Sequence, residues 1–307
     1  MGMSLGLRHP TDTSVVRWAW AAVAANTVII LTGGLVRLTG SGLGCPTWPR
    51  CTDESFVPHR ELGLHGVIEF GNRMLTYVLI VVVVATFVAV WRWSGTNGSL
   101  RRLTAVIVLG VPFQGVIGGI TVLTDLNPWV VSLHLVLSML LVAASVLLVV
   151  RVKGGTPAAY APRAVHVVVA AYLVLWVVVY LGTIVTGSGP HAGDDDAPRN
   201  LLDPQLMSRI HALSVYALVG LTIAACVLLR RTPVARLAIG LLLTELAQGV
   251  IGYVQYFTDL PIALVAAHLV GAALLVAVGT RLLVEVVVGR AAAQHGLPPR
   301  AESSLIR

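Results

Sequence analysis

Eight apolar stretches alternate along the chain with shorter polar connections. They span roughly residues 15–36, 64–91, 101–123, 129–150, 164–186, 207–229, 235–257 and 261–284. A helix needs about 20 apolar residues to cross the hydrocarbon core of a bilayer. Runs such as 79–90 and 135–150 carry no charge and are too long for the core of a soluble domain. The pattern therefore predicts an all-α, polytopic membrane protein with eight transmembrane helices.

Part of this pattern occurs twice. Residues 114–118, 124–126 and 134–136 recur without a gap at 248–252, 258–260 and 268–270, and the Thr-Gly-Ser-Gly motif at 39–42 recurs at 186–189. A repeat that starts on the same side of the membrane gives two halves related by an axis along the membrane normal. We therefore expect two pseudo-symmetric four-helix bundles, residues 15–150 and 164–284. A linker (151–163) joins them, and a polar tail (285–307), disordered beyond about residue 290, follows.

Charged residues give the orientation. The chain is 56% hydrophobic and only 11% charged, and 15 of its 21 Lys and Arg residues lie on one side of the predicted spans. The positive-inside rule predicts that both termini and the linker are cytoplasmic in the plasma membrane of a bacterium. The net charge of +7 follows from this topology. The arginines are scattered among short loops and give no support to nucleic-acid binding. The oligomeric state stays open, with a homo-oligomer as one candidate.

Two histidines lie inside apolar runs of the second half. His268 is about seven residues into its span and His211 about four, and both spans enter from the outer side. At 1.5 Å per residue both imidazoles lie roughly 6–11 Å below the outer helix ends. Matched depth across a four-helix bundle favours an axial pair for a haem iron. A hydrogen bond between helices or an interfacial histidine is the alternative.

The first half carries an incomplete version of this pair. His134 occupies the place of His268, but Asn72, a poor iron ligand, occupies the place of His211. His65, Glu69 and Asn72 share one helix face by their i, i+4 and i, i+3 spacing. This face indicates a second porphyrin pocket with a carboxylate for proton transfer. A buried Glu69–Arg73 ion pair explains the same residues equally well.

Other candidates lie near the outer surface. Arg73 and Arg209 are placed to meet haem propionates, or to snorkel toward lipid headgroups. Cys45 and Cys51 share a long outer loop, which is an oxidising location that favours a disulfide over two free thiols.

These residues together resemble the haem A synthase family, in an actinobacterial-like variant. The resemblance covers about residues 15–285 and rests on residues 39–51, 69–73 and 189–194 and on His134, His211 and His268. It implies an enzyme of eight helices in two bundles. This enzyme would oxidise the C8 methyl of haem O to the formyl of haem A, which is needed for terminal oxidase assembly.

The resemblance also implies a role for each half. It places a haem b cofactor on His211 and His268, with Arg209 beside it. The substrate haem falls in the N-terminal bundle, with Glu69 and His134 as catalytic groups. Asn72, Arg73 and His65 are then substrate-binding residues. Haem O synthase and an electron acceptor are the candidate partners beyond haem O and the lipid bilayer.

Two departures and two rival classes qualify this interpretation. Many relatives have histidine at the place of Asn72, and some have a cysteine pair in the loop at 187–206, which has none here. A b-type cytochrome subunit that exchanges electrons with quinone is the alternative function, but it normally needs two full histidine pairs. A transporter predicts broken helices at mid-membrane, and Pro112 is the only clear candidate for one.

Overall fold

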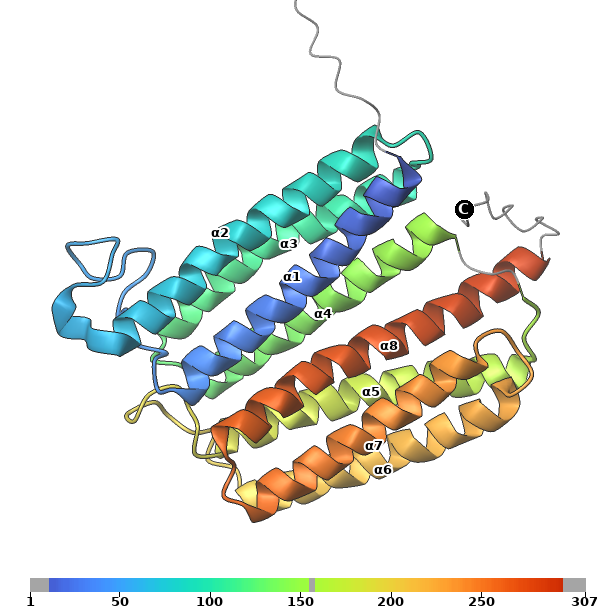
Figure 1. The fold of residues 1–307 in the computed structure, drawn as a ribbon. Helices are drawn as coiled ribbons and strands as arrows, with labels where there is room; N and C mark the ends of the chain where they lie inside the picture. The colour runs from blue at the N-terminus through green and yellow to red at the C-terminus, as the bar shows by residue number, and fades with distance from the viewer. Residues whose placement is uncertain (1–10, 155–157, 295–307) are drawn as a thin grey trace, which may run out of the picture.

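The computed structural model describes residues 11–154 and 158–294, with side chains to residue 288. Its helices are α1 (Asp12–Leu38), α2 (Gly63–Arg92), α3 (Gly98–Leu123), α4 (Pro128–Lys153), α5 (Pro162–Ser188), α6 (Pro204–Leu229), α7 (Ala235–Phe257) and α8 (Ile262–Gln294), with a short 3-10 helix, η1 (Arg60–Leu62). All eight long helices are apolar enough to cross a membrane (Figure 1). The predicted all-α architecture with eight spans is confirmed.

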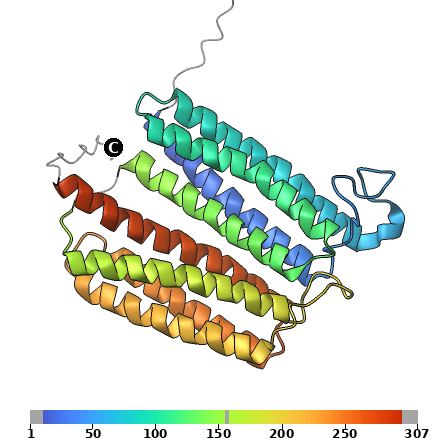
Figure 2. The same ribbon diagram turned by 180° about the vertical axis from the view of Figure 1, so that it is seen from behind.

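The helices form two groups that lie side by side (Figures 1 and 2). In the first group α1 packs on α2 and α4, and α3 on α2 and α4. In the second group α5 packs on α6 and α8, and α7 on α6 and α8. The seam between the groups is formed by α4 and α8, with further contacts of α1 with α8 and of α4 with α5. Each group therefore closes a ring of four helices.

The duplicated sequence forms the same turn in both halves. Asp125 and Leu126 after α3, and Asp259 and Leu260 after α7, all have φ between 51° and 58°. In each turn the leucine N–H donates to the carbonyl five residues earlier, at 2.8 Å to Thr121 and 2.9 Å to Gln255. A positive φ is uncommon for residues other than glycine, so its recurrence at both sites reflects a real structural repeat.

Local signals explain where several helices begin. Asn97, Asn127 and Asp203 each accept a backbone N–H of the first turn through the side chain, and Pro128 and Pro204 open their helices. An N-cap oxygen satisfies an otherwise unpaired amide, and proline at the first position loses no hydrogen bond. These caps fix the helix ends that carry the histidines in α4 and α6.

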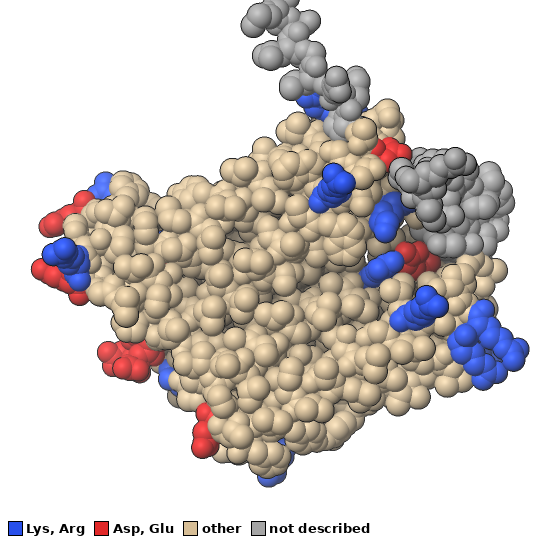
Figure 3. All heavy atoms as spheres, in the orientation of Figure 1, with Lys and Arg blue, Asp and Glu red and all other residues tan. Residues whose placement is uncertain are grey.

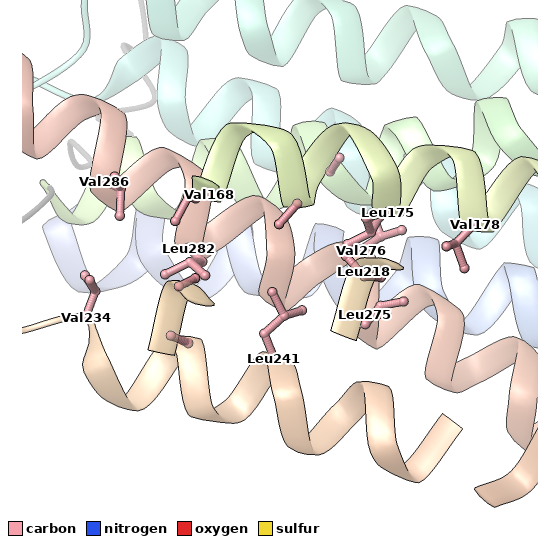
Figure 4. Packing of buried hydrophobic residues seen from close by; sticks show 14 of the residues in the cluster. Val168, Leu175, Val178, Leu218, Val234, Leu241, Leu275, Val276, Leu282 and Val286 are labelled. Atoms are coloured by element: carbon pink, nitrogen blue, oxygen red, sulfur yellow. The ribbon is translucent and has the colours of Figure 1, made fainter. Parts of the chain in front are cut away.

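The cores are aliphatic and lie between the helices. Figure 4 shows Leu175, Leu218, Leu241 and Val276 meeting inside the second group, and these side chains are at most 3% exposed. On the face seen in Figure 3, Lys, Arg, Asp and Glu side chains gather at the two ends of the helices and leave an uncharged band between them. Many large apolar side chains in this band are exposed, as expected of a lipid-facing surface.

The observed bounds differ from the expected ones mainly in α8. Seven helices begin and end within three residues of the predicted spans, whereas α8 continues to Gln294 through the start of the predicted tail. The linker residues 155–157, the end of the tail (295–307), and Arg8, Arg300 and Arg307 of the charge pattern lie outside the described residues.

Candidate functional site

Three histidines lie partly buried in the first turns of their helices, and each imidazole rests on a glycine of a neighbouring helix. A methyl group at Gly118 would lie 3.4 Å from Cε1 of His134, and one at Gly252 would lie 3.6 Å from Cε1 of His268. At Gly182 the corresponding distance to Cε1 of His211 is 3.3 Å. The glycines on α3, α5 and α7 thus leave room for the imidazoles of α4, α6 and α8.

The Nδ1 atoms of His134, His211 and His268 are buried without a partner at hydrogen-bond distance among the described residues, and the His211 ring also interacts with the backbone of Val178. No side chain of the described residues bonds these rings, so each imidazole keeps a nitrogen that can bind a ligand. His211 and His268 are close enough to interact electrostatically. The second bundle therefore brings its two predicted ligands together.

Asn72 occupies the fourth equivalent position, and a methyl group at Gly33 of α1 would lie 3.8 Å from its Nδ2. Its Oδ1 accepts a 2.7 Å hydrogen bond from the Thr32 hydroxyl. The amide is thus held by α1, and the four glycine-backed positions hold three imidazoles and one amide.

Glu69 lies on α2, 5% exposed, and both of its carboxylate oxygens are bonded. Oε1 accepts from Nε and Nη2 of Arg73 at 3.1 and 2.5 Å, and Oε2 accepts from the Cys45 backbone N–H at 2.6 Å. The ion pair considered from the sequence is present in the structure. Within the described part of the chain, Oε2 has one hydrogen-bond partner, so it retains capacity to accept another hydrogen bond.

Arg73 also holds the outer loop. Its guanidinium donates to the carbonyl oxygens of Cys45, Thr47 and Arg50 at 3.0 to 3.1 Å. The loop is closed by the predicted Cys45–Cys51 disulfide, which is confirmed, and both sulfurs belong to fully buried residues. Arg73 therefore joins the loop to α2, and its donors point to loop carbonyls.

His65 and Arg209 are exposed, unlike the three partly buried histidines. His65 is exposed in the first turn of α2, and its Nδ1 lies 2.9 Å from the Ser41 hydroxyl. It lines a polar cavity of about 480 Å³ between the two outer loops, with Pro190 and Asp194. Arg209 is exposed at the start of α6.

The loop that follows α1 and the loop that follows α5 are bonded to each other at the same end of the two bundles. Gly42 N–H donates to Gly193 O at 2.7 Å, and Arg37 Nε donates to His191 O at 2.7 Å. His191 Nε2 in turn lies 2.9 Å from the carbonyl oxygen of Leu260, in the turn before α8. These contacts connect the ends of α1, α5 and α8 across the seam.

Sequence reasoning missed two polar groups. Thr32, the partner of Asn72, gave no signal because a threonine in a span usually bonds its own helix. Glu245 did give a signal, since it is a carboxylate inside the apolar run 235–257. It is 2% exposed, and Thr222 of α6 donates to its Oε1 at 2.7 Å.

Fold and site together define a class: a duplicated eight-helix membrane protein with partly buried imidazoles at matched positions near one end of both bundles. The chain belongs to the COX15-CtaA family, described as cytochrome oxidase assembly protein, whose model matches residues 16–65 and 60–280.

Curated relatives carry the name haem A synthase. The chain is 28% identical over 136 residues to the protein of Listeria welshimeri, a match that covers 44% of each chain. It is 34% identical over 133 residues to that of Lysinibacillus sphaericus (42% of this chain, 43% of the relative). The value for Bacillus pumilus is 31% over 133 residues (42% of each). The matches thus span less than half the length of these relatives.

Proposed function

We propose that this protein is a haem A synthase, which oxidises the C8 methyl of haem O to a formyl group for cytochrome oxidase assembly. The family match across residues 16–280 carries the proposal, and the relatives named haem A synthase support it. Three partly buried imidazoles are the type of donor that haem iron uses.

The C-terminal bundle is the proposed cofactor half, with haem b held by His211 and His268. Both rings are backed by glycine, which lets a helix backbone approach a flat group closely. When bound, the haem would supply one-electron redox chemistry that carries electrons away from the substrate half. Exposed Arg209 is free to pair with a propionate by charge-assisted hydrogen bonds.

The N-terminal bundle is the proposed substrate half. Among the described residues of this half, His134 is the imidazole that lies against a helix glycine, and Asn72 is already bonded to Thr32, so a porphyrin there would have one protein ligand from this set. A substrate that must leave benefits from weaker ligation than a permanent cofactor. His65 is an unsuitable second ligand because it lies about 10 Å from Asn72 along α2 and is bonded to Ser41.

Glu69 is the proposed proton acceptor when the methyl group is oxidised. Its Oε2 retains acceptor capacity beside the Cys45 N–H, and Arg73 fixes its Oε1. Arg73 acts on the substrate through Glu69 and the disulfide loop, because its own donors are occupied by loop carbonyls.

We place the protein in a bacterial plasma membrane with both termini cytoplasmic and the haem sites toward the outer side, on the basis of its charge pattern. Haem O synthase and an electron acceptor are the proposed partners. Asn72 and the loop at 187–206 without cysteine are the features that mark the proposed actinobacterial-like variant.

The test is expression in a host that makes haem O but no haem A, followed by chromatography of the extracted haems. We expect haem A with the wild-type chain and with Glu54→Gln, an exposed control in the outer loop. We expect haem O alone with Glu69→Gln. Haem A made at the wild-type level by Glu69→Gln would reject the proton-acceptor role. Haem O alone with the wild-type chain would reject the function and favour the cytochrome alternative.

A further inference from the structure

Glu245 is a buried carboxyl group with no role in the proposed reaction. It lies 10 residues into α7, roughly 15 Å from the cytoplasmic end of that helix by its rise per residue. Its Oε1 accepts from the Thr222 hydroxyl, and its Oε2 has no hydrogen-bond partner within the described residues. An isolated ionised carboxylate is very costly in such a place, so one oxygen with a single neutral donor is a poor site for a permanent charge.

The group lies beneath the proposed cofactor histidines. Glu245 is seven residues from Gly252, the glycine behind His268, and Thr222 is 11 residues from His211. Seven residues are about two helical turns and 11 are about three, so each polar residue lies on the same helix face as the site above it. The carboxyl group is therefore roughly 10 Å below the His268 level along α7.

A polar stripe on α7 leads from this carboxyl group to the outer end. Gln248 and Gln255 share the face of Glu245 and Gly252, and the Oε1 atoms of both glutamines are buried without a hydrogen-bond partner among the residues that the structure describes. Gln248 packs against Gly271, one turn after His268. The equivalent of Glu245 in the first half is Val111, so the acid belongs to the second half alone.

Other polar groups face the same core. Cys226 of α6 interacts electrostatically with Glu245. From α5 and α8 the core presents Tyr172 and Thr280, whose hydroxyl groups lie 2.9 Å apart. The cluster around this core is mainly aliphatic, with residues such as Leu218 and Leu241 (Figure 4), and it also contains Tyr160 and Trp176. No cation contacts the carboxyl group among the described residues.

We propose that Glu245 is a redox-linked proton-binding site. When the haem on His211 and His268 gains one electron, the Glu245 carboxylate binds one proton, and it releases that proton when the electron leaves. The electron comes from the substrate half, or in a titration from a soluble mediator. The stripe of Gln248 and Gln255 offers acceptors for water that delivers the proton from the outer side. This inference rests on the haem b assignment of the proposed function.

The physical reason is charge balance in a medium of low dielectric constant. An added electron and a carboxylate repel each other more strongly there than in water, so reduction raises the affinity of Glu245 for a proton. Linkage is reciprocal, so protonation of Glu245 favours the reduced haem by the same factor. The midpoint potential of the haem should therefore fall as pH rises.

The test is a potentiometric titration of the purified protein, followed by haem absorbance at several pH values. Wild type and Asp259→Asn, an exposed control in the turn after α7, should show a midpoint potential that falls with pH. Glu245→Gln keeps the size of the side chain and should lose this dependence. An unchanged pH dependence in Glu245→Gln would overturn the proposal while leaving the haem assignment intact.

A second measurement tests the proposal on the wild-type protein, in case the Glu245→Gln variant does not fold. The infrared difference spectrum between reduced and oxidised wild type should contain a carboxylic-acid carbonyl band that appears on reduction, and Thr222→Val should move it by removing its hydrogen-bond donor. A wild-type protein that binds haem but shows no such band would refute the proton-binding role of Glu245 and leave the haem assignment intact. Purified protein without haem absorbance would reject both the cofactor assignment and this inference.

Discussion

Removal of Arg73 should detach the disulfide loop from α2. In Arg73→Leu the Glu69 carboxylate loses two charge-assisted hydrogen bonds and keeps only the Cys45 N–H. The carbonyl oxygens of Cys45, Thr47 and Arg50 lose their guanidinium donor at the same time. The loop would then be held to α2 mainly by the Cys45 bond to Glu69.

The size of the effect follows from burial. A hydrogen bond to a charged group contributes about 1.5–3 kcal/mol, and Arg73 gives the loop three of them, whereas its ion pair with Glu69 lies within α2. We therefore take about 3 kcal/mol as the loss in free energy of loop opening, well below the sum of three such bonds because the Arg73 side chain is 18% exposed. Since 1.4 kcal/mol is a factor of ten in an equilibrium constant, the open loop should be roughly 100-fold more populated.

The assay is the rate at which a water-soluble phosphine reduces the Cys45–Cys51 disulfide, followed by alkylation and mass spectrometry. Both cysteines are fully buried, so reduction requires opening, and its rate reports the open population. Arg60→Leu is the matched control, because Arg60 is an exposed arginine close to the same loop. A rate for Arg73→Leu within twofold of the control would refute the anchoring role.

Three further predictions concern the bundles and the orientation. Gly252→Leu should displace the His268 ring and abolish a low-spin haem spectrum, whereas Gly240→Leu, with open space around it, should keep that spectrum; equal spectra would reject the role of the glycine. Asn72→His should supply a second ligand and increase the haem bound to the N-terminal bundle; unchanged haem content would contradict this. Reporter fusions at Arg307 should be active only in the cytoplasm, and periplasmic activity would reverse the proposed topology.

Much of the fold could be predicted because it depends on local patterns. Apolar run length fixes the spans, and the repeated residues at 124–126 and 258–260 indicated a duplication, although the shared turn and its left-handed backbone came only from the structure. The disulfide followed from two cysteines in one outer loop. The end of α8 did not follow, because residues after 284 remain compatible with a helix although the apolar run weakens there.

The site was less predictable because its geometry depends on contacts between distant residues. Glu69 and Arg73 were predicted as a possible pair, but the Cys45 N–H that holds Glu69 Oε2 comes from 24 residues away. Gly118, Gly182 and Gly252 lie against the three histidines, but a glycine inside a span indicates by itself only close packing of helices. Which glycine faces which imidazole required helix rotations that periodicity does not give.

We assign the substrate haem to the N-terminal bundle and the haem b cofactor to the C-terminal bundle. Haem analysis of purified variants is the test of this assignment. The type and amount of haem per chain would be measured for wild type, His134→Ala and His268→Ala. We expect His134→Ala to bind haem b in the wild-type amount and to make no haem A. We expect His268→Ala to lose haem b. Loss of haem b in His134→Ala together with its retention in His268→Ala would contradict the assignment of the two bundles.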